Sequence, residues 1–235
     1  MTGLGARAAA LAAAATLLAG CVPPFAGDET PSGAPAKDPG RQLTQAEVDA
    51  ALPDLPASAE PVEEEAEDPD DIEPTTSPAE CLAVRLDGPT FDALREDKVV
   101  SAERSWSSDE PAGAVTTAHV ASYSRPVGPE PLDAAGAATG GCSAFTYSGR
   151  DASGDFTLHM GAAPRTVDPV GEQTFAVRIT VEEVIGGADR RVHIDHLAVR
   201  SGHNLILLTR THWADDATHA DLEQHAREAL DNLAT

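Results

Sequence analysis

The chain has 235 residues, with 39 acidic against 16 basic side chains and a formal net charge of −23. So acidic a surface excludes the usual mode of nucleic-acid binding, because phosphates need Lys and Arg to neutralise them. It also disfavours electrostatic docking on anionic lipid. The length suits one domain of ordinary size together with a linker.

Residues 1–21 have the layout of an export signal. Arg7 precedes an apolar run from Ala8 to Ala19, which is too short for a membrane-spanning helix of about 20 residues. The run ends in Leu18-Ala19-Gly20-Cys21, which resembles the lipobox of bacterial lipoproteins. The resemblance implies cleavage before Cys21 and its acylation, for example with palmitate. The protein would then be anchored by lipid on the extracytoplasmic face of the cell membrane. The alternative is an ordinary secretory signal with a coincidental cysteine.

Two segments separate this signal from the predicted body. Residues 22–40 are rich in Pro, Gly, Ala and Ser, which predicts a flexible tether. Residues 41–77 begin with a capping box at Thr44-Gln45-Ala46-Glu47, which predicts a short helix from Gln45 to about Leu52. The acidic, proline-interrupted run over residues 60–73 is expected to be a disordered linker. It lacks the ligand spacing and turn glycine of a calcium-binding EF-hand.

Residues 78–235 are expected to form the folded body. Apolar periodicity and turn signals define its elements. The predicted helices are Thr90–Lys98 and Pro131–Ala138, and the predicted strands are Val115–Tyr123, Ser143–Ser148, Asp155–Met160, Thr174–Val184, Arg190–Arg200 and Leu205–Leu208.

Tight, glycine-containing turns such as Gly202-His203-Asn204 join the last strands, which predicts an antiparallel meander. Alternate residues from Phe175 to Val181 point to one face, so we expect that face to be covered and the other to be partly wet. A final amphipathic helix follows Asp215, with an apolar stripe from Leu222 to Leu233. The predicted fold class is therefore α+β: an antiparallel twisted sheet with flanking helices and an amphipathic C-terminal helix.

Cys81 and Cys142 remain as an even pair once Cys21 is acylated. Outside the cytoplasm such a pair is expected to form a disulfide, the alternative being two free thiols. The chain has no C-x-x-C motif, so a thiol-exchange role has no support.

Several short motifs occur together in this chain: Leu43–Val48, Pro78-Ala79-Glu80-Cys81, Ala198-Val199-Arg200, Gly202-His203-Asn204, Leu205–Leu208 and Asp216–Leu233. This set resembles the extracellular sensor domain of PknH-type mycobacterial serine/threonine kinases and the actinobacterial lipoproteins that share it. The resemblance covers about Arg41 to Thr235. It implies a non-enzymatic domain that binds a ligand in a cleft between sheet and helices. That family usually has two disulfides, whereas this chain can form one.

The eight histidines raise a metal-binding hypothesis, which is strongest at His193-Ile194-Asp195-His196. On a strand, His193 and Asp195 share a face and His196 points away. Zinc would need further ligands, such as His203 or His159. The alternative is that these are solvent-facing or cross-strand histidines, and the spacing does not favour a metal site.

Catalytic motifs are missing: the chain has neither G-x-S-x-G nor S-x-x-K. Carboxylates abound, but no pair stands out as a glycosidase site. No cofactor is indicated. Trp106 and Trp213 are the first candidates for ligand contact if a cleft exists.

The sequence thus predicts a lipid-anchored extracytoplasmic domain, not an enzyme, that binds a small molecule, lipid or cell-envelope component. The alternatives are an envelope protein that binds a basic partner protein and, less favoured, an envelope hydrolase.

Overall fold

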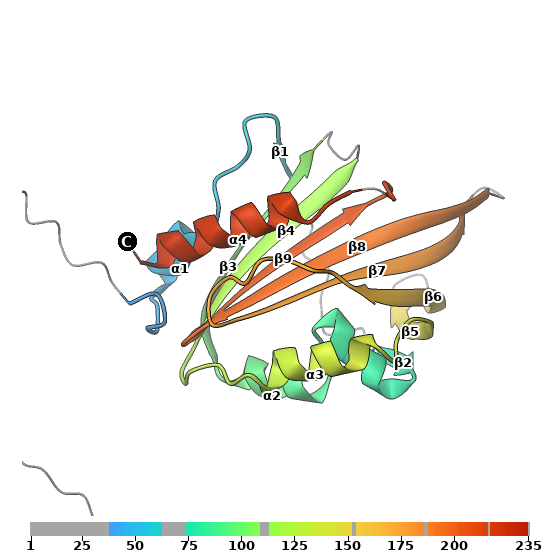
Figure 1. Cartoon of the computed structure of the whole chain (residues 1–235), viewed down its shortest axis with the longest axis horizontal. Helices are drawn as coiled ribbons and strands as arrows, with labels where there is room; N and C mark the ends of the chain where they lie inside the picture. Colours follow the sequence, from blue (N-terminus) through green and yellow to red (C-terminus); the bar gives the residue numbers. More distant parts are fainter. Residues whose placement is uncertain are drawn as a thin grey trace, which may run out of the picture. The chain divides into compact units, whose positions relative to one another are not determined.

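The computed structural model describes residues 38–62, 74–108, 113–151, 154–185, 188–215 and 217–234. All of them belong to one compact unit, built on a nine-stranded antiparallel sheet in the order β1-β3-β4-β9-β8-β7-β6-β5-β2 (Figure 1). The strands are β1 (Glu60–Val62), β2 (Thr75–Ser77), β3 (Lys98–Ser108), β4 (Ala114–Tyr123), β5 (Phe145–Asp151), β6 (Gly154–Pro164), β7 (Gln173–Ile185), β8 (Ala188–Ser201) and β9 (Asn204–His212).

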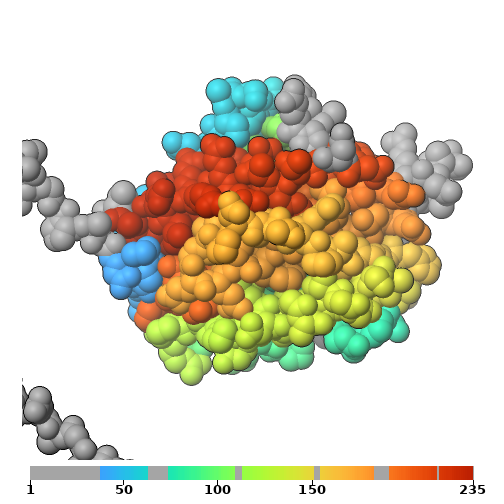
Figure 2. All heavy atoms as spheres, viewed as in Figure 1, coloured from blue at the N-terminus to red at the C-terminus, as the bar shows by residue number. Residues whose placement is uncertain are grey.

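Helices cover both faces of this sheet. On one face lie α1 (Gln45–Ala51) and α4 (Ala220–Leu233), and on the other lie the 3-10 helix η2 (Ala79–Arg85), α2 (Pro89–Glu96) and α3 (Glu130–Thr139). In Figure 2, α4 (red) and α3 (yellow-green) lie along opposite margins of the body, with orange strands between them.

The prediction that one face is partly wet is therefore wrong for most of the sheet. Phe175 and Val177 point into the core under η2, α2 and α3, while Leu197 and Ile206 point into the core under α1 and α4. Strands that are buried on both faces need apolar residues at both alternating sets of positions, and β7, β8 and β9 have them.

The predicted α+β class is confirmed, and most elements form close to where they are predicted. The predicted hairpin forms from β5 and β6, with Phe145 opposite Met160. The sequence does not predict β3, because its side chains show no clean alternation, and the helix predicted to run to Lys98 ends at Glu96. Glu60–Val62 forms β1 although it was expected to be disordered, and the rest of that acidic run lies outside the described residues.

The residues that precede α1 are held by the turn between β8 and β9. The Asn204 side-chain amide donates to the carbonyls of Pro39 and Arg41 at 2.8 and 2.9 Å. The predicted capping box forms at the start of α1, and α1 packs on α4 and β3. The body therefore includes the helix that the sequence places in a linker, rather than beginning at Pro78.

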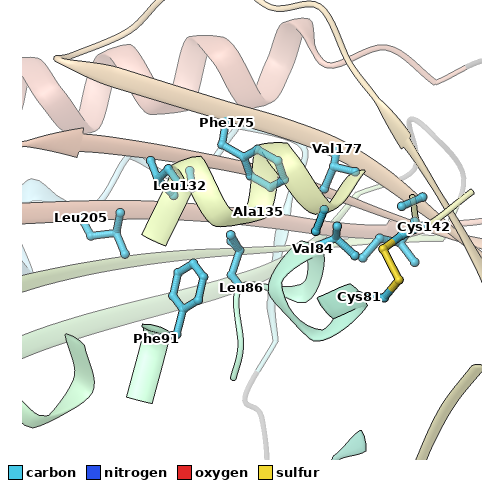
Figure 3. Packing of buried hydrophobic residues seen from close by; sticks show 14 of the residues in the cluster. Cys81, Val84, Leu86, Phe91, Leu132, Ala135, Cys142, Phe175, Val177 and Leu205 are labelled. Carbon is cyan, nitrogen blue, oxygen red and sulfur yellow. A yellow bond between two sulfur atoms is a disulfide. The ribbon is translucent and has the colours of Figure 1, made fainter. Parts of the chain in front are cut away.

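The predicted disulfide joins Cys81 of η2 to Cys142, which follows α3, with 5.6 Å between their Cα atoms (Figure 3). Both residues are fully buried, beside Val84 and Val177. The bond fixes η2 against the end of α3. Because α2 follows η2 directly, the disulfide also helps to place α2 over the sheet.

Replacing Gly202 should loosen the segment before α1. Its φ is +54°, and an added Cβ would lie 2.2 Å from the Gly40 carbonyl oxygen, so Gly202→Ala forces the two backbones apart. We expect a loss of about 1–3 kcal/mol in the free energy of unfolding, measured by urea denaturation. Limited proteolysis should also cut before α1 more rapidly.

Gly140→Ala is the matched control, because a Cβ there meets nothing within 4 Å and no strained φ is present. Equal stability of the two variants would show that the contact between Gly202 and Gly40 does not hold this segment.

Candidate ligand-binding cleft

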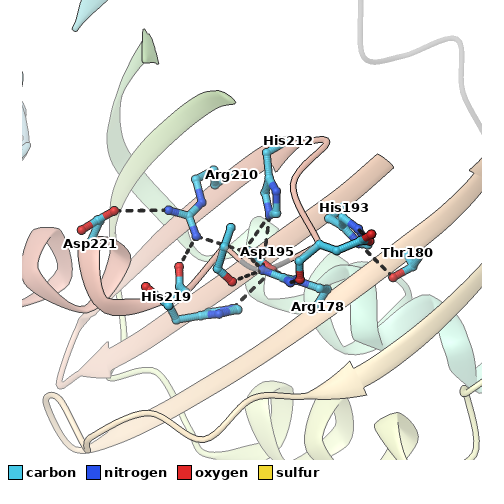
Figure 4. A network of polar contacts seen from close by, with 11 residues as sticks. Arg178, Thr180, His193, Asp195, Arg210, His212, His219 and Asp221 are labelled. Carbon is cyan, nitrogen blue, oxygen red and sulfur yellow. Dashed lines mark hydrogen bonds and ion pairs between the residues drawn. The ribbon is translucent and has the colours of Figure 1, made fainter. Parts of the chain in front are cut away.

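A fully buried carboxylate, Asp195 on β8, is the centre of an ion cluster on the α4 face of the sheet (Figure 4). Arg178 of β7 donates from Nε and Nη2 to its two oxygens at 2.7 and 2.8 Å. Arg210 Nη2 and His212 Nε2, both on β9, lie 3.1 and 3.0 Å from Oδ2. Burial alone would raise the pKa of Asp195, but hydrogen bonds from Arg178 and His212 outweigh burial and hold that pKa well below its usual range.

The same two guanidinium groups hold the loop that leads into α4. Arg178 donates to the carbonyls of Asp215 and Ala217 at 3.0 and 2.7 Å, and Arg210 donates to the carbonyl of Thr218. These bonds satisfy loop carbonyls that would otherwise face the sheet without partners. The cluster is therefore an anchor that docks α4.

Thr180, His193 and Asp215 form a hydrogen-bonded series beside this cluster. His193 Nδ1 lies 3.1 Å from Thr180 Oγ1, and its Nε2 lies 2.8 Å from Asp215 Oδ1. This order of hydroxyl, imidazole and carboxylate matches a catalytic triad. However, the Thr180 backbone lies in the middle of the sheet, between Gly161 and His193, where main-chain groups serve strand pairing rather than an oxyanion. We assign it no hydrolytic reaction.

The metal candidates predicted from the sequence do not converge. His193 and Asp195 share a face of β8, but the contacts described above already engage both of them. His203 lies in the turn after β8, with Nδ1 2.9 Å from a carbonyl of β4, and His159 is exposed on β6. No group of three or more His, Cys, Asp or Glu side chains in the described ranges could hold a metal ion.

A cleft of about 430 Å³ lies on the opposite face, between α2 and strands β3, β4 and β9, within the size range of small-molecule sites. One wall is apolar and comes from Phe91 and Leu94 of α2 and Leu205 and Leu207 of β9. Its other lining residues are Leu86, Arg95, Lys98, Glu103, Thr117, His119, Tyr123 and Thr209.

His119 and Tyr123 of β4 supply neutral polar groups to this cleft. Burial, and secondly the charge of Lys98, lower the pKa of His119 to about 4. Burial raises the pKa of Tyr123 to about 12. Within the described residues, neither the imidazole nor the phenol hydroxyl has a hydrogen-bond partner. Both are therefore uncharged near pH 7 and can bond to a ligand.

A polar row crosses the sheet at one end of the cleft. Thr117 and Thr209 stand opposite each other on β4 and β9. On either side, Ser105 Oγ lies 2.9 Å from Thr117 Oγ1 and His196 Nδ1 lies 3.0 Å from Thr209 Oγ1. The row marks where the apolar wall ends, so the cleft is amphipathic along the strands.

A larger hollow of about 760 Å³ lies along β5, β6 and β7 on the α4 face. Its lining includes His159 and Glu182, which are exposed and face each other across β6 and β7. No helix residue lines it, so it would bury an apolar molecule less completely than the cleft beside α2. We therefore take the α2 cleft as the candidate site.

The other predicted site residues lie elsewhere. Trp106 is 2% exposed and packs edge-on against His225 of α4, so it is a core residue. Trp213 is 45% exposed but does not line the cleft. Cys21 lies outside the described residues. Among the described helices, none is long and apolar enough to cross a bilayer.

No family model matches the chain, and no curated protein matches it. Among solved structures, it is similar to the extracellular domain of PknH from Mycobacterium tuberculosis. The TM-score is 0.50 and the identity 12%, over 83% of this chain and 98% of the PknH chain. A likeness at this identity concerns the fold, and it supports the PknH-like fold that the sequence motifs suggest.

Acid should destabilise the fold before its carboxylates are protonated. Burial lowers the pKa of His119 and His219 to about 4 and that of His196 to about 3. In the unfolded chain each imidazole has the ordinary histidine pKa of about 6.5, so it binds a proton more readily there than in the folded protein. Stability is therefore retained above pH 6.5 and lost as the pH falls toward 4, by up to about 1.4 kcal/mol per pH unit for each group. Urea denaturation at pH 7.0, 5.5 and 4.5 measures this slope.

His196→Asn should flatten that slope, because asparagine keeps a polar atom near Thr209 and does not titrate. His159→Asn, at an exposed position, should leave the slope as in the wild type. If His196→Asn and the wild type lose stability in parallel, His196 does not contribute to the acid sensitivity.

Proposed function

We propose that this chain is a lipid-anchored extracytoplasmic protein whose body binds an apolar small molecule, without catalysis, in the cleft between α2 and the sheet. The observation that carries the proposal is an apolar wall in which Leu94 and Leu207 are partly exposed and Phe91 and Leu205 lie buried behind them, beside unpartnered polar groups. Apolar walls with a few convergent polar groups are the usual composition of small-molecule sites.

The location rests on three features. The N-terminal segment ends at Cys21 in a lipobox-like sequence, the Cys81–Cys142 disulfide is suited to an oxidising compartment, and the similar PknH structure is an extracellular domain. Acylation would hold the body at the membrane despite its acidic surface, since more than one acyl chain gives stable anchoring.

Docking of a partner protein is the less favoured alternative. The large exposed apolar side chains within the described residues are Leu55, Val99 and Trp213. They come from three separate segments, whereas a protein interface usually needs a contiguous patch of several hundred Å².

The cleft should bind a neutral apolar probe. N-phenyl-1-naphthylamine fluoresces when it leaves water, and we expect saturable binding at one site per chain. Leu207→Trp should weaken this binding at least about tenfold, because the larger ring fills the cleft from β9.

Leu158→Trp is the matched control, since Leu158 of β6 is also partly buried but lies outside the cleft. Circular dichroism and urea denaturation would verify that both variants fold. Absence of saturable probe binding to the wild type, or unchanged binding to Leu207→Trp, would refute the cleft as the site.

Anchoring is tested separately in a bacterial host that acylates lipoproteins. Radiolabelled palmitate should label the wild type and not Cys21→Ser, and the variant should move from the membrane fraction to a soluble one. Palmitate-free wild-type protein in the soluble fraction would overturn the anchor and leave the cleft proposal intact.

A further inference from the structure

The candidate cleft contains an unpaired positive charge. Lys98, the first residue of β3, lines the cleft and stands opposite Tyr123 of β4. Its ammonium forms no ion pair with any carboxylate in the described ranges. The second cation in the lining, Arg95, is already paired with Asp87 and Asp92. The carboxylate in the lining, Glu103, is engaged with another group. Lys98 is therefore the charged group that is left for a ligand.

Two neutral hydrogen-bonding groups accompany this charge. His119 is close enough to Lys98 for the ammonium to contribute to lowering the imidazole pKa, and Tyr123 is the register partner of Lys98. An ammonium, an imidazole N–H and a phenol O–H are all donors, and none has a partner within the described part of the chain. Such a set suits an acceptor that carries negative charge.

The net charge of the protein disfavours small free anions as ligands for this cleft. With a net charge of −23, the surface repels small anions and attracts cations. A free inorganic anion would gain only an exposed contact with Lys98, which is weak in water. An anion attached to an apolar chain also gains binding free energy when that chain is buried against Leu94 and Leu207. The apolar chain then provides most of the affinity, and Lys98 discriminates between head groups.

We propose that the cleft selects an amphipathic anion, with its apolar chain along Phe91, Leu94 and Leu207 and its carboxylate or phosphate head at Lys98. This inference rests on the proposed function, because it needs the cleft to bind an apolar chain. It adds the chemical class of the ligand.

The test compares head groups on one chain length, below the concentrations at which these compounds form micelles. Decanoate, decyl phosphate, decanol and decylamine each compete with N-phenyl-1-naphthylamine for the purified protein. We expect the anions to bind up to about fivefold more tightly than decanol, the advantage that one exposed ion pair supplies. Decylamine should bind least tightly, and inorganic phosphate should not compete.

Lys98→Gln should remove the advantage of the anions and leave the affinity for decanol unchanged. Arg150→Gln is the matched control, because it changes the net charge equally but alters an exposed residue of β5 outside the cleft. If the affinity for the anions falls in Lys98→Gln and not in Arg150→Gln, the loss comes from the local contact with Lys98 and not from the change in the net charge of the protein.

The outcomes distinguish this inference from the proposal beneath it. If decanol competes as well as decanoate and decyl phosphate, or if Lys98→Gln changes nothing, selection of an anion is refuted while the apolar cleft stands. Tightest binding of decylamine refutes it equally. If no decyl compound competes and the probe itself does not bind, the cleft proposal fails as well. A preference between decanoate and decyl phosphate identifies the source as a fatty acid or a phosphorylated lipid.

Discussion

The arrangement of this protein depends on one buried carboxylate. Asp195 accepts hydrogen bonds from Arg178 and Arg210 across three neighbouring strands. The same guanidinium groups also donate hydrogen bonds to carbonyls of the loop before α4. Burying charges is expensive unless they are paired and hydrogen-bonded. Some of that cost remains, because the Arg210 Nε and His212 Nδ1 atoms are buried without a hydrogen bond in the described ranges. The hydrogen bonds from the two arginines fix the position of α4, which covers β8 and β9 on that face.

The other face is covered differently, and the difference creates the cleft. Instead of an ion cluster, the Cys81–Cys142 disulfide fixes η2 against α3, and α2 follows η2 along the chain. These three helices share a core with Phe175 and Val177 of β7. Toward β3 and β4, side chains from α2 leave a hollow above Leu207. The helices that complete the core therefore also provide the wall of the candidate site.

Local patterns predict much of this fold and little of the site. Three features depend on residues that the sequence shows directly: the alternation over β7, the Thr44–Glu47 capping box and the cysteine pair. The strand, the capping box and the disulfide that they predict all form. The role of Arg178 cannot be read from the sequence. An arginine that alternates with apolar residues on a strand normally faces solvent, and the loop that buries this one lies far along the chain, just before α4. The cleft is equally hidden: its lining comes from three segments between Leu86 and Thr209, which meet only through strand order and register. An unpaired lysine beside a histidine has no sequence signature.

The two faces also differ in what their polar groups can still do. Both oxygens of Asp195 are occupied, and its arginines are bonded to main-chain carbonyls, so those groups stabilise structure. Lys98 is exposed in the cleft lining, His119 is half-buried and Tyr123 is buried, yet within the described ranges none of these three side chains has a partner. Partially enclosed polar groups without partners add nothing to the stability of the fold, because their hydrogen bonds must be made with something outside the chain. The contrast in hydrogen bonding, rather than the number of charged residues, identifies the α2 cleft as the side of the sheet where a ligand is to be sought.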